Sequence, residues 1–126
     1  MSIRLLALGF LALLAGCKAV QVYDGERRSS EEVARISGSL PFTAGAPVSV
    51  ILRQVDERTL SVSQTAVEVL PGPHRLLVDC RIAETGSVTR HSIEVEVAAG
   101  RHYRLRAETG PGLRCSGVTL EAADGS

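Results

Sequence analysis

Apolar and polar side chains alternate along several segments of this 126-residue chain, most clearly over residues 74–82 and again over 93–97 and 103–107. Successive side chains of a strand point to opposite faces of a sheet, so the alternation predicts strands with one buried face. Turn-forming residues separate these segments: Asp56-Glu57, Pro71-Gly72-Pro73, Glu84-Thr85-Gly86, Ala99-Gly100 and Gly110-Pro111-Gly112. Residues 33–126 are therefore expected to form a small antiparallel β-sandwich of about seven strands. Gly117 is expected to mark a β-bulge, because the apolar residues on its two sides differ in parity.

The first 16 residues have the organisation of a secretory signal peptide. Arg4 supplies a positive charge, and residues 5–15 form an uninterrupted apolar run. The run is too short to cross a bilayer, which takes roughly 20 residues as a helix, but it has the length of a signal-peptide core. A buried core helix explains the segment less well, because the run is apolar on every face.

Residues Leu14-Ala15-Gly16-Cys17 resemble the lipobox of bacterial lipoproteins. The resemblance implies signal cleavage between Gly16 and Cys17, and attachment of a diacylglycerol to the Cys17 thiol. Lys18 stands where an Asp would retain a lipoprotein in the inner membrane, so the resemblance implies transfer to the outer membrane. Two or more acyl chains anchor a protein stably. We therefore expect a lipid-anchored protein of the cell envelope that faces the periplasm, with residues 17–32 as a lipidated tether.

Of the three cysteines, Cys80 and Cys115 remain as a pair if Cys17 carries lipid. Both fall on the apolar parity of their segments, and secreted domains form disulfides readily. Metal or redox chemistry is the alternative, but the chain has no Cys-x-x-Cys spacing, and two thiolates alone make a poor zinc site. We therefore expect one structural disulfide between Cys80 and Cys115.

The expected tether contains the most distinctive residues outside the core pattern. Ser29 and Glu32 have capping-box spacing, which allows a short helical turn before residue 33. Tyr23, Gly25, Arg28 and Glu32 have two interpretations: they dock a partner at the membrane surface, or they latch the tether onto the sandwich. In the latch, Tyr23 packs on the domain and Glu32 pairs with Arg28.

Three short segments resemble known proteins. Two segments are similar to turn-and-strand sequences of PEGA-type β-sandwich domains. They are residues 70–76, Leu-Pro-Gly-Pro-His-Arg-Leu, and residues 98–105, Ala-Ala-Gly-Arg-His-Tyr-Arg-Leu. Residues 23–28 together with 31–34 resemble the start of uncharacterised small bacterial lipoproteins. These resemblances imply a sandwich fold and an envelope location, and they bring no catalytic residues.

Composition argues against a nucleic-acid partner. Lys and Arg total 14, Asp and Glu total 14, and aromatic residues are 3% of the chain. A basic surface that neutralises phosphates and aromatic rings that stack on bases are therefore not expected.

The candidate chemical groups also favour structural roles. If residues 88–97 and 102–108 form a hairpin about Ala99-Gly100, His91 lies roughly 20 Å from His102, too far to share a metal ion. Glu94 and Glu96 share one face at a spacing that suits glycosidase chemistry, but cross-strand pairs with Arg90, Arg104 and Arg106 explain them more simply. We expect no catalytic residue, metal site or cofactor, and the sequence identifies no small-molecule substrate.

These observations lead to one preferred function and one alternative. The preferred function is a non-enzymatic, membrane-anchored periplasmic lipoprotein that acts as an interaction or accessory module in envelope maintenance or assembly, with an envelope protein as partner. The alternative is a ligand-binding or inhibitor domain that acts on a periplasmic hydrolase.

Overall fold

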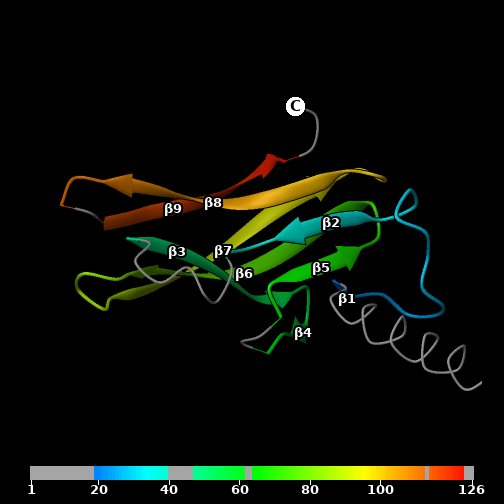
Figure 1. The fold of residues 1–126 in the computed structure, drawn as a ribbon, viewed down its shortest axis with the longest axis horizontal. Helices are drawn as coiled ribbons and strands as arrows, with labels where there is room; N and C mark the ends of the chain where they lie inside the picture. The colour runs from blue at the N-terminus through cyan, green and yellow to red at the C-terminus, as the bar shows by residue number, and fades with distance from the viewer. Residues whose placement is uncertain (1–18, 40–46, 62–63, 113, 124–126) are drawn as a thin grey trace, which may run out of the picture.

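The structure, a computed structural model, describes residues 19–39, 47–61, 64–112 and 114–123. These residues form nine β-strands (Figure 1). The strands are β1 (Val20–Gln21), β2 (Ala34–Ser37), β3 (Val48–Val55), β4 (Arg58–Thr59), β5 (Ala66–Val69), β6 (Gly72–Ile82), β7 (Val88–Val97), β8 (His102–Gly110) and β9 (Arg114–Ala122).

The strands form two sheets, which overlap in the view of Figure 1. One sheet has the order β1-β5-β2-β8-β9, and the other has the order β4-β3-β6-β7. Most neighbours are antiparallel, while the β1–β5 and β2–β8 pairs are parallel. The expected all-β sandwich is confirmed. The strand number exceeds the expected seven, since β1 and β4 have two residues each and are too short to show alternation.

The core lies between the two sheets and follows the predicted alternation. In β6, Leu76, Val78 and Cys80 are fully buried, whereas Arg75 and Arg81 are exposed. The largest fully buried side chains come from both sheets: Ile36, Leu52, Val55, Val67, Val69, Leu76, Val78 and Cys80. Burial of these aliphatic side chains is the main favourable term for folding, at about 1.5–3 kcal/mol for each large one.

A disulfide between Cys80 and Cys115 crosses this core, as the sequence predicted. Cys80 belongs to β6 and Cys115 to β9, so the bond joins the two sheets covalently. Their Cα atoms are 6.4 Å apart, within the usual range for a disulfide.

The bulge expected near Gly117 is present in β9. Glu108 of β8 lies opposite Gly117, and Thr109 lies opposite Cys115, so Ser116 has no partner in the register. The extra residue shifts the parity of the strand. Cys115 and Val118 therefore both turn toward the core, although they are an odd number of residues apart.

The sandwich begins earlier than the boundary expected at residue 33. β1 runs beside β5, with Val20 opposite Val67, and Val22 joins the core. The segment before β2 forms a turn rather than a helix, in which the Glu32 N–H donates to the Ser29 carbonyl at 3.0 Å. None of the described residues belongs to a helix that could cross a membrane.

The connection after β7 also differs from the expectation. The sequence suggested a hairpin between residues 88–97 and 102–108, but β7 and β8 belong to different sheets. Residues 98–101 carry the chain from one layer to the other, and the Gly100 N–H donates to the Val33 carbonyl at 2.8 Å. Gly100 has a φ of 77°, a conformation that glycine adopts without steric cost.

Candidate functional site

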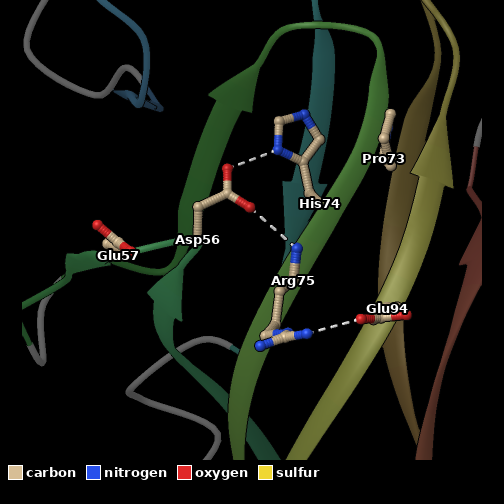
Figure 2. Close-up of a pocket in the computed structure, with 6 residues that line it drawn as sticks. All are labelled: Asp56, Glu57, Pro73, His74, Arg75 and Glu94. Atoms are coloured by element: carbon tan, nitrogen blue, oxygen red, sulfur yellow. Dashed lines mark hydrogen bonds and ion pairs between the residues drawn. The ribbon is translucent and has the colours of Figure 1, made fainter.

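A depression of about 380 Å³ opens where the β3–β4 turn meets the start of β6 (Figure 2). The residues that line it come from three segments: Asp56 and Glu57 from the turn, Pro73, His74 and Arg75 from β6, and Glu94 from β7. They meet because β3 and β7 both pair with β6, in registers that set Val55 opposite Leu76 and Glu94 opposite Arg75. The result is a charged, open surface at one end of the sandwich.

His74 links the β3–β4 turn to Leu70, which precedes β6. Its side chain is 11% exposed, with Nδ1 2.8 Å from Asp56 Oδ2 and Nε2 2.6 Å from the Leu70 carbonyl oxygen. Both partners are oxygen acceptors when Asp56 is ionised. Both ring nitrogens are therefore in contact with oxygen atoms of neighbouring residues.

Asp56 forms the other half of this link. It has a φ of 54°, a left-handed conformation that Asp tolerates better than most residues. Its Oδ1 accepts the Arg75 N–H at 3.0 Å, and its own N–H donates to the Arg75 carbonyl at 2.7 Å. Partial burial by itself raises the pKa of Asp56, but the Arg75 N–H and the His74 ring outweigh it and hold that pKa below the ordinary 3.8.

Arg75 and Glu94 form an exposed ion pair at the rim of the depression, with 2.8 Å between Nη2 and Oε1 (Figure 2). The hydrogen bond to Glu94 raises the pKa of Arg75. The sequence correctly predicted that Glu94 pairs across strands, but the expected partners on β8 were wrong. Arg106 of β8 pairs with Glu121 of β9 in the other sheet instead.

The lining residues are mostly charged. None of the six lining side chains carries a hydroxyl or a thiol, and Glu57 and Glu94 are the carboxylates that lie beside the His74–Asp56 pair. Its charges are largely paired with one another. Such a surface can hold a turn in a fixed shape and present Glu57 and Pro73 to a partner.

A second depression, of about 370 Å³, lies next to the first and is lined partly by the N-terminal segment. Tyr23 is 6% exposed there, and its hydroxyl accepts the Arg28 N–H at 2.9 Å. Asp24 pairs with Arg58 of β4 at 2.6 Å, and Arg27 pairs with Glu68 of β5. Residues 20–27 are therefore held against both sheets.

The remaining latch residues occupy a turn, and they do not pair as the sequence suggested. Gly25 has a φ of 93°, and its carbonyl accepts a hydrogen bond from the Gln21 amide at 2.8 Å. Glu32 accepts from the Ser29 hydroxyl at 3.2 Å. Arg28 and Glu32 form no ion pair in the described part of the chain, and Arg28 instead contributes its backbone N–H to Tyr23.

Asp79 is a buried carboxylate that the alternation pattern placed in solvent. It does lie on the outer face of β6, yet it is only 9% exposed because two arginines cover it. Arg90 of β7 contacts it at 2.8 Å and 3.2 Å, and Arg53 of β3 approaches to 3.5 Å. The hydrogen bond to Asp79 raises the pKa of Arg90.

The other residues singled out in the sequence are not brought together. Gly16 and Cys17 lie outside the described residues. His91 is on β7, His102 is on β8 in the other sheet, and His74 is occupied by Asp56. Within the described ranges, no group of three or more His, Cys, Asp or Glu side chains is arranged to hold a metal ion.

Comparisons of the chain with protein-family models, with curated proteins and with solved structures found no match.

Proposed function

We propose that this chain is a non-enzymatic lipoprotein of the cell envelope, anchored in the outer membrane through Cys17 and facing the periplasm. Its sandwich acts as an interaction module in envelope maintenance or assembly. The observation that carries the proposal is the position of β1. β1 begins at Val20, three residues after Cys17, so a lipid on Cys17 would be connected to the sheet by a very short stretch of chain.

The distance between anchor and domain is short. Ala19 is buried, and its carbonyl accepts a hydrogen bond from Arg27 at 3.2 Å. Cys17 precedes Ala19 by two residues, which span at most about 7 Å. A lipid on Cys17 would therefore hold the sandwich against the leaflet and restrict its orientation, which suits a module that meets partners at the membrane surface.

The proposal of a non-enzymatic role rests on how the charged groups are used. The two ring nitrogens of His74 contact Asp56 and the Leu70 carbonyl, and Arg75 forms an ion pair with Glu94. Groups held in this way stabilise turns, whereas a general base needs a free lone pair within reach of a substrate proton. The exposed Glu57 between these pairs is the natural contact point for a partner.

Labelling of the full-length chain with a palmitate analogue tests the anchor. We expect label on the wild-type protein and none on Cys17→Ser, which should also leave the membrane fraction. Cys80→Ala is the matched control, because it removes a different cysteine and should keep the label. Label that persists on Cys17→Ser would contradict the proposed anchor.

Site-specific crosslinking tests the interaction role. A photoreactive residue at position 57 should capture an envelope protein in cells, whereas one at the exposed position 119 of β9 should not. Equal capture at both positions would argue against recognition through the His74 end of the sandwich.

The alternative, an inhibitor domain, draws support from the rigid β3–β4 turn. Asp56 fixes this turn through the Arg75 backbone, and inhibitory loops gain affinity when they are ordered before binding. Equimolar inhibition of lysozyme or a periplasmic protease that Glu57→Ala abolishes would favour this alternative.

A further inference from the structure

β7 has an unpaired edge that is long and regular. Its ten residues pair with β6 from Val97 opposite Gly72 to Val88 opposite Arg81, without a register shift. No other described strand pairs with its second edge. Unpaired N–H and C=O groups on such an edge are a template for another strand.

The other edge strands are protected in ways that β7 is not. β1 and β4 have two residues each, which is too few to hold a partner strand. β9 carries the bulge at Ser116, which interrupts a continuous ladder. Among the described strands, β7 is thus the edge most suited to pairing with a strand from outside the chain.

The charges on β7 indicate which strand would fit. Arg90, Ser92 and Glu94 share the outer face of the strand, with Ser92 midway between the two charges. An antiparallel copy of β7 that sets Ser92 opposite Ser92 would place Arg90 of each copy opposite Glu94 of the other. Directly opposite side chains on antiparallel strands have Cβ atoms about 4.5–5.5 Å apart, which is close enough for ion pairs.

This register also continues the ion pairs inside each chain. Asp79 of β6 contacts Arg90, and Arg75 of β6 contacts Glu94, both at 2.8 Å. Across the four strands of a joined sheet, each row would read Asp79, Arg90, Glu94 and Arg75, with the charge alternating at every step. A partner shifted by two residues would place Arg90 opposite the uncharged Ser92, or opposite Glu96, whose neighbour on β6 is Pro73, so the row of four charges would be incomplete.

We infer that β7 binds a second copy of this chain, as an antiparallel strand with Ser92 at the twofold axis. On the inner face, the same pairing sets His91 opposite Ile93 and Thr89 opposite Val95, and it would cover the half-buried Ile93 and Val95. The inference does not depend on lipid attachment. Anchoring of two copies in one leaflet would only raise the frequency of their encounters.

Charge complementation tests the pairing. Full-length chains with two different affinity tags are mixed in a non-ionic detergent, and co-purification of one tag with the other is measured. Arg90→Glu alone sets Glu against Glu, and Glu94→Arg alone sets Arg against Arg. We expect each to reduce self-association at least about tenfold, since facing like charges are strongly unfavourable.

The mixture of the two variants is the decisive arm. Arg90→Glu presents two acidic residues and Glu94→Arg presents two basic residues, so the mixed pair regains both attractive contacts. We expect co-purification to return toward the wild-type level. A wild-type chain that does not self-associate, or a mixture that stays as weak as the single variants, would overturn the inference and leave β7 to a strand of another protein.

Two controls separate this pairing from unspecific effects. Arg106→Glu and Glu121→Arg break another exposed ion pair, on β8 and β9, and should leave self-association unchanged. Ser92→Cys, which keeps all charges, should form a disulfide-linked dimer on mild oxidation, because residue 92 meets itself at the twofold axis. Thr119→Cys, on exposed β9, should not, and equal dimer yields from the two cysteine variants would also overturn the inference.

Discussion

The Cys80–Cys115 disulfide should account for a large share of the stability of the sandwich. The cysteines are 35 residues apart in the sequence, so the bond closes a long loop of the unfolded chain. In the chain-entropy description, a loop of this length lowers the entropy of the unfolded state by roughly 13 cal/mol/K, or about 4 kcal/mol at 25 °C. A domain of this size typically has about 5–15 kcal/mol in total.

Reduction with dithiothreitol is the cleanest perturbation, because it leaves both sulfur atoms in the core. Urea unfolding of the oxidised and reduced protein, followed by far-ultraviolet circular dichroism, should give a free energy of unfolding about 3–4 kcal/mol lower after reduction. Cys80→Ala combined with Cys115→Ala should cost at least as much, since Cys80 is fully buried and its sulfur would leave a small cavity. A difference below about 1 kcal/mol between the oxidised and reduced forms would refute the loop-entropy reasoning.

Three further predictions follow from single contacts. Tyr23→Ala removes a buried ring and should lower the free energy of unfolding by about 3 kcal/mol. Tyr23→Phe loses only the hydrogen bond from the Arg28 N–H and should lower it by about 1 kcal/mol. Equal losses for the two variants would contradict the role of the buried ring. Asp56→Asn should destabilise the protein at neutral pH. The pKa of Asp56 is lowered in the folded protein, so its contribution to the free energy of unfolding is present above pH 3.8 and is lost as the pH falls through the folded pKa. The free energies of unfolding of the wild type and Asp56→Asn should therefore converge in acid. Gly38→Ala should cost about 2 kcal/mol or more in thermal unfolding, because its Cβ would lie 2.8 Å from the Val50 carbonyl oxygen, whereas the control Gly110→Ala meets no atom within 4 Å and should change little.

The alternation of side chains was sufficient to predict the parts of the fold that depend on burial. It identified the inward faces of β6 and β8, and it placed Cys80 and Cys115 where a disulfide could join them. It also located the bulge at Gly117, because a change of parity within one strand has few other causes. These features are local in sequence, so one segment suffices to reveal each of them.

Features that depend on which strands are neighbours were not predictable in the same way. Ala99-Gly100 is a turn signal whether the chain forms a hairpin or crosses between sheets, so β7 and β8 were expected to pair. The contact of His74 with Asp56 depends on the register of β3 against β6, which shifts between Leu52 and Gln54. Asp79 has the parity of a solvent-facing residue, and its burial results from arginines on two neighbouring strands.

Because β1 is a strand of the larger sheet, the choice of starting residue matters for any shortened version of the protein. A fragment cut at residue 33 would lose Val22 and Tyr23 from the core and would strip β5 of its neighbour on one side. A bare β5 edge would invite aggregation between fragments, so soluble versions should keep every residue from Ala19 onward.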